Sequence, residues 1–502
     1  MIPHEETIAA LATAPGVGGI GILRISGSRA AAVLRTLFVP HRLASLQPDG
    51  SLPSHKLCYG TVRDRHGTVL DEVMAVFMQA PHTYTREDVA EIQCHGSYLV
   101  QQAILAEIFA TGVRAAEPGE FTKRAFLAGR IDLTQAEAVI DLLQAQSMGG
   151  VKLAVGQMQG QLHERISQIR NALVEMLATV ELALDFPEDE TDILNTDHLL
   201  EQLDQQVEQP LQFLLALADQ GRVIREGIKA VITGRPNVGK SSLLNQLLQE
   251  ERALVTEIPG TTRDTIEELI SVHGIPVHLV DTAGIRDHED VVEALGIERA
   301  RQKMQEADLI LFVVDASQGL THVDRSLYSS VEQSNRVVVL NKVDKVDIAD
   351  ATDATDATDI TDTLLLKELR SFFGTVPQVQ TAAKHGVGIT ELRETLYQVI
   401  IGSVGSVGSV GKDDNDSNDG HIGEEKIINE RIACAPNLRH TVILQKTQRA
   451  CDQVKQTLLF GAPADLLAVD LRAALDYLAD IVGLTTPDDV LDVLFSRFCI
   501  GK

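Results

Sequence analysis

Three short motifs place residues that can handle phosphates and a base at the ends of predicted strands. The first, GRPNVGKSS at residues 234–242, follows the β-type run KAVIT and precedes a helical pattern. Its glycines let the backbone wrap around phosphates, Lys240 can reach the β- and γ-phosphates, and Ser241 can ligate Mg²⁺. This order of strand, glycine-rich loop and helix predicts a P-loop.

Two further motifs predict that the base is guanine. DTAG, residues 281–284, ends a second strand, where Asp281 can hold Mg²⁺ through water and Gly284 can sense the γ-phosphate. NKVD, residues 341–344, ends a later strand, and Asp344 can accept hydrogen bonds from N1–H and the 2-amino group of guanine. Adenine lacks this donor pair, and a lost charged hydrogen bond costs about 1.5–3 kcal/mol. GTP rather than ATP is the implied substrate.

Two loops complete the predicted GTP site. TEIPGTTRD, residues 256–264, offers Thr262 as a second Mg²⁺ ligand on a loop that orders with the γ-phosphate. TAAK, residues 381–384, can cover the base, although Ala382 stands where GTPases usually carry Ser. Ile285 follows DTAG where Ras-like enzymes use Gln, and an apolar side chain cannot orient water. The candidate GTP contacts are Asn237, Val238, Gly239, Lys240, Ser241, Ser242, Thr256, Glu257, Ile258, Pro259, Gly260, Thr261, Thr262, Asp281, Thr282, Ala283, Gly284, Asn341, Lys342, Val343, Asp344, Ala382, Ala383 and Lys384.

Composition predicts an acidic protein of a reducing compartment. The 502 residues include 44 Lys and Arg against 71 Asp and Glu, a formal charge of −27, so an RNA partner must be met by a local basic patch. The N-terminal MIPHEETIAA lacks the features of a signal peptide, and no apolar run approaches about 18 residues. We expect a cytoplasmic protein without a membrane span. Five cysteines lack disulfide or zinc spacing, and all but the last are expected to be buried thiols: Cys58, Cys94, Cys434, Cys451 and Cys499.

The elements that must position these motifs fall into several predicted domains. Residues 1–121 alternate β-type runs such as GIGILRIS and VMAVFMQA with one helical pattern, YLVQQAILAEIFA, which indicates an α+β domain. Residues 227–402 alternate strands with helical lengths, the pattern of a doubly wound parallel sheet. This Ras-like α/β domain is inserted into an all-α domain made of residues 122–226 and 429–502.

Helical periodicity defines the two parts of the all-α domain. In the first part, Thr134 and Glu137 have capping-box spacing and predict a helix start. A long helix then follows with a seam of apolar residues at alternating steps of four and three: Leu162, Ile166, Ile169, Leu173, Met176 and Val180. The second part has a similar pattern: Leu471, Ala474, Leu475, Leu478 and Val482. Two low-complexity stretches, 350–363 and 403–420, cannot build a core, and we interpret the latter as part of a linker, 403–428.

Nearly the whole chain resembles the MnmE family, also called TrmE, of bacterial and organellar tRNA-modifying GTPases. The resemblance is carried by TAPGVGGIGILRISG, TYTREDVAEIQCHG, EPGEFTKRAFLAGRIDLTQAEAVIDL, LDFPEDE, the GTPase motifs with IPGTTRD and GIERA, and the terminal FCIGK, in the family's order. It implies that K⁺ beside the GTP phosphates stabilises charge in place of an arginine finger. The implied K⁺ ligands are Asn237, Thr256, Ile258 and Thr261, and the implied catalytic residue that positions water is Glu293.

The resemblance also implies a folate site in the N-terminal domain. GVGGIGILRISG cannot be a Rossmann fingerprint, because it runs into a strand where that motif needs a helix. The implied ligand is 5,10-methylene- or 5-formyl-tetrahydrofolate, with contacts at Arg24, Glu91, Arg130 and Lys502. Cys499 in the terminal FSRFCIGK is an implied member of the same centre, as a nucleophile, an RNA contact or only part of an anchor.

The expected activity is GTP hydrolysis, a reaction on an acid anhydride, coupled to tRNA modification. By resemblance, a homodimer joined through the N-terminal domains works with the FAD protein MnmG (GidA) in a heterotetramer or larger complex. Together they would add a carboxymethylaminomethyl or aminomethyl group to C5 of the wobble uridine of certain tRNAs. FAD belongs to the partner, because no FAD fingerprint occurs in this sequence. Two alternatives are a regulatory GTPase switch that binds a ribosomal or membrane partner, and a folate enzyme controlled by GTP.

Overall fold

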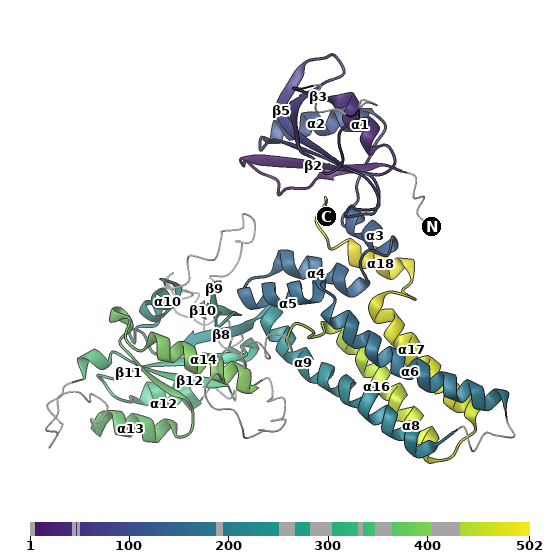
Figure 1. The fold of residues 1–502 in the computed structure, drawn as a ribbon. Coiled ribbons are helices and arrows are strands. Elements are labelled where there is room, and N and C mark those ends of the chain that lie inside the picture. Colours follow the sequence, from purple (N-terminus) through teal and green to yellow (C-terminus); the bar gives the residue numbers. More distant parts are fainter. Residues whose placement is uncertain are drawn as a thin grey trace, which may run out of the picture. The chain divides into compact units, whose positions relative to one another are not determined.

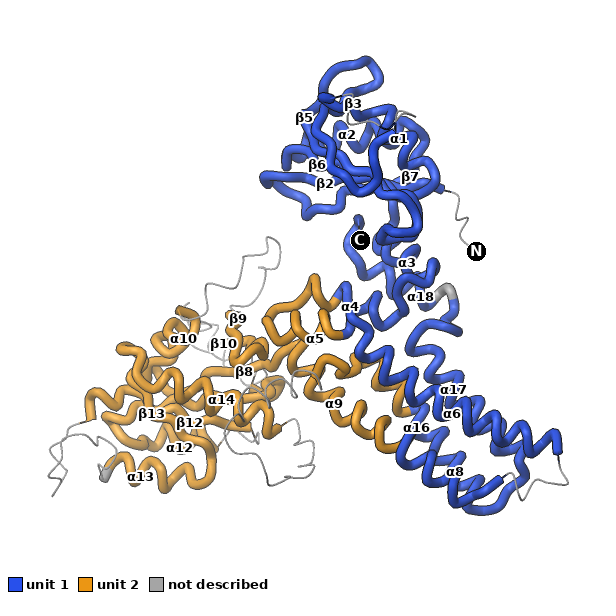
Figure 2. Tube along the Cα trace, in the orientation of Figure 1, with its two compact units in different colours: residues 1–140, 157–207, 446–502 blue, residues 141–156, 208–445 orange. Residues whose placement is uncertain are grey.

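The computed structural model describes residues 6–42, 47, 51–186, 194–249, 267–281, 304–329, 335–346, 364–403 and 432–501. The chain divides into two compact units (Figure 2). Unit 1 contains residues 1–140, 157–207 and 446–502, and unit 2 contains residues 141–156 and 208–445. Both low-complexity stretches lie outside the described residues, apart from Ser403.

Unit 1 begins with a seven-stranded sheet that carries two helices (Figure 1). The sheet order is β3-β4-β5-β6-β2-β1-β7, and only the β1–β7 pairing is parallel among the described pairs. Helices α1 and α2 contact each other and both contact β5 and β6, so they pack on the sheet as one apolar layer. The bounds are β1 Ile8–Leu11, β2 Ile20–Ser26, α1 Ala30–Leu37, β3 Phe38–Pro40, β4 Cys58–Arg63, β5 Val69–Met78, β6 Val89–His95, α2 Tyr98–Ala110 and β7 Arg114–Ala115.

Helices of the all-α part follow the predicted periodicity. All six residues of the predicted seam are buried in α6, which packs along α17. Of the predicted pattern in α17, Leu471, Ala474, Leu478 and Val482 are buried and Leu475 is half-buried. The helix α18 packs on α3 through a cluster that includes Leu133, Phe495 and Phe498. The bounds are α3 Glu120–Leu127, α4 Leu133–Gln144, α5 Met148–Met158, α6 Gln161–Asp185, α8 Thr196–Gln202, the π-helix η3 Leu203–Glu208, α9 Gln209–Glu226, α16 Leu438–Leu459, α17 Ala464–Val482 and α18 Asp488–Phe495.

The predicted capping box of α4 is wrong. Thr134 and Glu137 lie inside the helix and are buried. The cap is Asp132, whose Oδ1 accepts hydrogen bonds from the amides of Thr134 at 2.7 Å and Gln135 at 3.1 Å. A carboxylate directly before the first turn reaches these two amides and is also favoured by the positive end of the helix dipole.

Unit 2 contains the predicted doubly wound sheet, with strand order β13-β12-β11-β8-β10-β9. Every residue of β11 is buried, as expected for a strand covered on both faces. The edge strand β9 departs from the parallel prediction, because a two-residue turn at His273 and Gly274, both with positive φ, returns the chain antiparallel to β10. The bounds are β8 Ile228–Thr233, α10 Lys240–Gln249, β9 Glu267–Val272, β10 Ile275–Asp281, β11 Leu309–Asp315, α12 His322–Ser329, β12 Arg336–Asn341, η5 Val343–Lys345, α13 Leu364–Phe373, β13 Gln378–Thr381, η8 Ala383–His385 and α14 Ile389–Ser403.

The predicted fold class is confirmed as an N-terminal α+β domain, a helical domain and a P-loop α/β domain. The division into the five residue ranges given above stays a prediction. Among the helices in the described ranges, none combines the length and apolar character that crossing a membrane would require.

Candidate functional site

The P-loop joins β8 to α10 and is held in a conformation that needs its glycines. Gly234 and Gly239 have φ values of 147° and 103°, and a Cβ on either would lie 2.3 Å from another atom, Val313 O and Asn341 Nδ2 respectively. Lys240 is buried, and its Nζ donates to the carbonyls of Gly234 at 2.9 Å and Arg235 at 2.8 Å. The ammonium group therefore lies along the loop at the start of α10, where amide groups and the helix dipole favour an anion.

Asn341 fastens the P-loop to the loop that was predicted to cover the base. Its Nδ2 donates to the carbonyl of Val238 at 2.8 Å, and its Oδ1 accepts from the amide of Ala383 at 3.0 Å and from Thr381 Oγ1 at 3.2 Å. All of these groups are buried. The structure thus brings together three motifs that are about 100 and 40 residues apart in the sequence.

Lys342 makes a second link, through a residue that the sequence reading missed. Its Nζ donates to the carbonyl of Asn237 at 2.6 Å and to Asp315 Oδ2 at 2.7 Å. Burial alone would raise the pKa of the Asp315 carboxyl, but hydrogen bonds from Lys342 and Ser317 outweigh burial and lower it. One feature of the sequence could have indicated Asp315: it ends a buried strand that runs parallel to β8, so it lies at the same end of the sheet as the P-loop.

The candidate base-recognition residues lie beside this link. Asp344 keeps 31% of its side chain exposed, and its Oδ2 lies 3.6 Å from Nε2 of His385 in the turn after TAAK. Ala382 is buried, so the position where many GTPases carry Ser contributes only a methyl group here. A carboxylate that is ordered at one edge and open to solvent can accept the paired donors of guanine.

Arg235, the second residue of the P-loop, is anchored away from the phosphate-binding amides. Its Nε donates at 2.8 Å to Oδ1 of Asp324, which is fully buried. The other oxygen of Asp324 accepts from the amide and hydroxyl of Thr321 at 3.0 and 2.7 Å. No motif in the sequence points to this pair, which holds the start of the P-loop against α12.

Several predicted site residues cannot be placed. The K⁺ ligands of the switch loop, the catalytic Glu293 and the Mg²⁺ ligand Thr262 lie outside the described residues, as do most of DTAG and the terminal lysine. The residues concerned are Thr256, Glu257, Ile258, Pro259, Gly260, Thr261, Thr262, Thr282, Ala283, Gly284, Glu293 and Lys502, together with the side chain of Asp281.

Unit 1 brings together two of the predicted folate contacts. Arg24 on β2 and Glu91 on β6 are direct cross-strand neighbours, and Arg24 Nε donates to Glu91 Oε1 at 2.8 Å. The Arg24 guanidinium carbon also lies 5.7 Å from the ring centroid of Phe121. A carboxylate, a guanidinium and an aromatic ring therefore meet at one point of the sheet, a set that can bind pterin N–H donors and folate carboxylates.

The C-terminal tail reaches the same point within one chain (Figure 1). Arg24 Nη1 donates to the carbonyl of Gly501 at 3.4 Å. A Cβ on Gly501 would lie 2.1 Å from the carbonyl oxygen of Leu11, so only glycine permits this approach. Cys499 is exposed, whereas the other four cysteines are buried as predicted, and burial raises the pKa of Cys94 to about 11.

Arg130 stacks on Tyr84, a second aromatic ring near Phe121. Its guanidinium carbon is 4.7 Å from the ring centroid of Tyr84, and Nη1 donates to the Tyr84 carbonyl at 3.3 Å. Tyr84 packs against a cluster that contains Phe121, the ring beneath Arg24. The two predicted folate-binding arginines therefore both stack on rings of one cluster.

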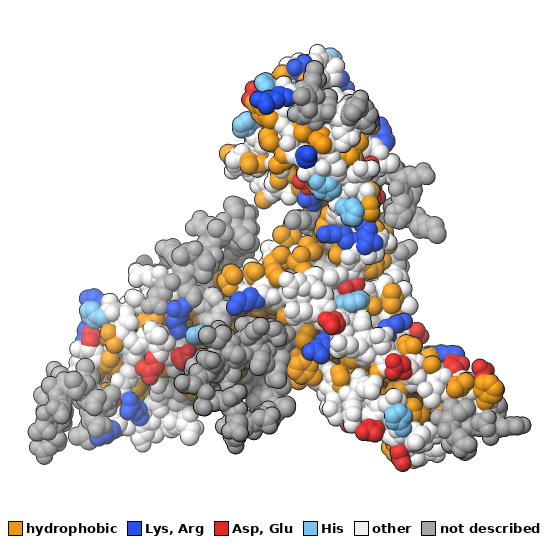
Figure 3. All heavy atoms as spheres, viewed as in Figure 1, with side chains coloured by type: hydrophobic (Ala, Val, Ile, Leu, Met, Phe, Trp, Pro, Cys, Tyr) orange, Lys and Arg blue, Asp and Glu red, His pale blue; other side chains and the backbone are white. Residues whose placement is uncertain are grey.

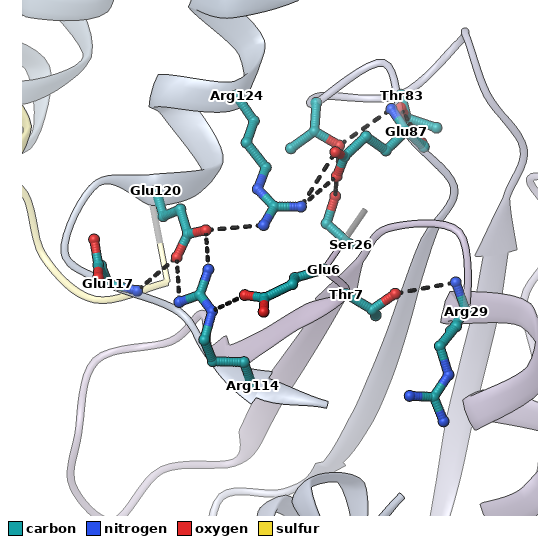
Figure 4. Close-up of polar contacts among 11 residues, drawn as sticks. Glu6, Thr7, Ser26, Arg29, Thr83, Glu87, Arg114, Glu117, Glu120 and Arg124 are labelled. Carbon is teal, nitrogen blue, oxygen red and sulfur yellow. Dashed lines mark hydrogen bonds and ion pairs between the residues drawn. The ribbon is translucent and has the colours of Figure 1, made fainter. Parts of the chain in front are cut away.

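A charged network, absent from the sequence reading, fixes α3 to the sheet (Figure 4). Arg124 donates to Glu120 at 2.8 Å and to both oxygens of Glu87, and Arg114 donates to Glu120 at 2.6 and 3.1 Å. Glu87 also accepts from Ser26 Oγ at 2.7 Å, two residues from Arg24 on β2. The network thus connects α3 to the strand that carries a predicted folate contact.

Fold and site together define a P-loop GTPase whose GTPase domain is joined to an N-terminal sheet and a helical domain. The model of the GTP-binding protein TrmE N-terminus matches residues 7–130, and the model of the MnmE helical domain matches residues 133–499. The chain belongs to the MnmE family. A tRNA modification GTPase MnmE of Desulfotalea psychrophila is 46% identical over 99% of this chain and 98% of its own length. Similarly named proteins of Geobacter sulfurreducens and Geotalea uraniireducens are 43% and 40% identical, each over 99% of both chains.

Proposed function

We propose that this chain is a K⁺-dependent GTP hydrolase that acts with the FAD protein MnmG on the wobble uridine of certain tRNAs. The product would carry a carboxymethylaminomethyl or aminomethyl group on C5. The observation that supports this most strongly is the fastening of the P-loop to the guanine-recognition motif through Asn341 and Lys342. It occurs in a chain that matches named tRNA modification GTPases along 99% of its length.

In this proposal, Lys240 holds the β- and γ-phosphates, Ser241 and Thr262 hold Mg²⁺, and Asp344 selects guanine. Asn237 is an exposed P-loop residue with a φ of 65°. Its side-chain amide oxygen is a suitable ligand for a hard cation such as K⁺. A cation there supplies charge stabilisation near the transferring phosphate when it is bound. Glu293 would position the attacking water, because Ile285 cannot.

The N-terminal domain is proposed to hold the tetrahydrofolate that supplies a one-carbon unit. The pairing of Arg24 with Glu91 beside Phe121 supports this, as does the approach of Gly501. Arg130 and Lys502 complete the proposed contacts, and Cys499 is the candidate reactive group of the tail. Titration with 5-formyl-tetrahydrofolate compares the affinity of the Arg24→Gln variant with that of the wild type. Unchanged affinity would show that Arg24 does not contact the folate.

Nucleoside analysis of tRNA from cells that lack this gene tests the proposed function. We expect loss of the C5 substituent on wobble uridine, and its return when the gene is supplied on a plasmid. A plasmid that encodes Glu293→Ala should not restore it, because GTP would bind without being hydrolysed. If the amount of C5-substituted uridine is the same in the deleted strain as in the parent strain, the modification function is contradicted and a regulatory GTPase switch is favoured.

A further inference from the structure

A cluster of basic side chains in unit 1 is not used by the GTP site. Lys, Arg and His side chains gather over α3 and the adjoining end of the N-terminal sheet (Figure 3). Exposed residues of this cluster come from two segments before β6 and from the loop after α3. We call these residues the basic surface: His55, Lys56, His82, Arg86 and Arg130. In a chain with a formal charge of −27, such a cluster is a local exception.

Direct contacts hold the members of the basic surface together. His55 Nε2 lies 2.9 Å from the carbonyl oxygen of His82, which joins the first two segments. Arg86 Nη1 donates to the carbonyl of Ala128 at 2.8 Å, and Arg130 stacks on Tyr84, so the second segment and the loop after α3 are joined as well. His55, His82, Arg86 and Arg130 therefore belong to one ordered surface, and Lys56 follows His55 in the chain.

The two carboxylates next to Arg86 in the chain, Glu87 and Asp88, are engaged in other hydrogen bonds. Both oxygens of Glu87 accept from Arg124, and one also accepts from Ser26. Asp88 Oδ1 accepts from the amide of Ala80 at 3.0 Å. Within the part of the chain that the structure describes, neither carboxylate pairs with Arg86 or Lys56, so the positive charge of these two exposed side chains faces solvent.

Backbone conformation singles out the same surface. Among the described residues, five non-glycine residues have positive φ: His55, Arg86, Asn237, His273 and Lys342. One of these forms the β9–β10 turn, and Asn237 and Lys342 belong to the GTP site. The remaining two, His55 and Arg86, lie in the basic surface. Left-handed backbone is uncommon for residues other than glycine, most of all for a side chain such as Arg, and it occurs often at ligand-binding sites as well as in turns.

We infer that the basic surface, through Lys56 and Arg86 beside the proposed folate contact Arg130, binds backbone phosphates of the tRNA substrate. This rests on the proposed function, because it takes tRNA as the substrate. Exposed guanidinium and ammonium groups bind phosphates well. The acidic remainder of the chain repels RNA, so this positive surface also orients the approach.

The test measures binding of an unmodified tRNA transcript to the full chain between 50 and 250 mM KCl. In the double variant Lys56→Gln with Arg86→Asn, two phosphate contacts are lost, and Asn tolerates the backbone of residue 86. We expect affinity at 0.1 M salt to fall about 30-fold, and the slope of log affinity against log salt to fall by about 2. The variant Arg86→Lys should retain most of the affinity.

The matched control is Arg35→Gln with Arg65→Gln, which removes the same charge from the same sheet domain. Arg35 is exposed on α1, and Arg65 is paired with Glu107. An equal loss of affinity in the control, or unchanged affinity in the test variant, overturns the inference. Weaker 5-formyl-tetrahydrofolate binding with unchanged tRNA binding would also overturn it and assign the surface to the folate site. GTP hydrolysis and thermal midpoint confirm folding.

A wild-type chain that retains no tRNA transcript even at 50 mM KCl would also overturn the inference. That outcome leaves the proposed function open to nucleoside analysis of the deleted strain, because MnmG would then make the RNA contacts. The two failures are therefore distinguishable.

Discussion

At the scale of single residues, the proposed selection of guanine depends on one carboxylate, that of Asp344. Asp344 follows Lys342, which is tied to Asp315 and to the P-loop carbonyl of Asn237. The position of the Asp344 carboxylate is thus coupled to the loop that holds the phosphates. The sequence motif was enough to propose Asp344 but did not point to Asp315, because Asp315 acts through a contact with Lys342 that joins two strand ends 27 residues apart.

Replacing Asp344 by Asn should change which base is bound. The amide offers one acceptor and a donor, so it cannot accept both guanine N–H groups, and GTP affinity should fall about 10- to 150-fold. Xanthosine triphosphate has an oxygen in place of the 2-amino group and should gain affinity for the variant. Equilibrium titration with fluorescent analogues of both nucleotides measures this.

Asp308→Asn is the matched control for that variant. Asp308 Oδ2 accepts from the amide of Lys229 at 2.9 Å, at the end of the sheet where β8 and β11 begin. This control should leave the preference for GTP over xanthosine triphosphate unchanged. A preference for GTP that survives in Asp344→Asn would place base recognition elsewhere.

At the scale of elements, α3 is fixed to the sheet by charges that are removed from water. The side chains of Arg124 and Glu120 are each only 6% exposed. Removing one partner of such a pair leaves the other charge buried and unpaired. We therefore expect Arg124→Gln to lower the free energy of unfolding by about 3–5 kcal/mol, measured by urea denaturation. The control Arg65→Gln removes a guanidinium that is 58% exposed from its pair with Glu107 and should cost less than about 1 kcal/mol.

The same network predicts a dependence of stability on pH. Burial raises the pKa of Glu120, but hydrogen bonds from Arg114, the Glu117 amide and Arg124 outweigh it, so the folded pKa lies below the ordinary 4.5. The carboxylate thus stabilises the fold fully above that value, and the contribution is lost as pH falls through the lowered pKa. Wild type should lose stability in this range more steeply than Glu120→Gln. Parallel pH profiles of the two proteins would contradict this.

Sequence periodicity predicted long elements better than their ends. The seam of α6 was fully predicted, because six apolar positions at helical spacing have no other common explanation. The start of α4 was assigned to Thr134, because the capping box matched, whereas Asp132 lies nearer to the free amides. The antiparallel β9 was missed, because β propensity carries no information on strand direction.

At the scale of the whole molecule, the two units carry separate proposed chemistries. The described part of unit 2 holds the P-loop and the guanine motif, and unit 1 holds Arg24, Glu91 and the tail. The order of motifs predicted the insertion of one domain into another, and it led to the proposed GTP site, whereas the proposed folate site came from the family resemblance. The contacts of Gly501 with Arg24 and Leu11 could not be predicted from spacing, because they join the two ends of the chain.

Coupling between copies of the chain should appear in the cation dependence of GTP hydrolysis. The family resemblance implies that GTP and K⁺ at Asn237 draw the GTPase domains of two copies together. Turnover in KCl should then exceed turnover in NaCl at equal ionic strength by tenfold or more, on the order of a 1.4 kcal/mol effect. Phosphate release measures this, and light scattering of the GTP-bound protein reports association.

Asn237→Ala should bring the rates in KCl and NaCl together while GTP still binds. Glu293→Ala should bind GTP but hydrolyse it slowly in both salts. Equal wild-type rates in KCl and NaCl would remove the proposed role of Asn237.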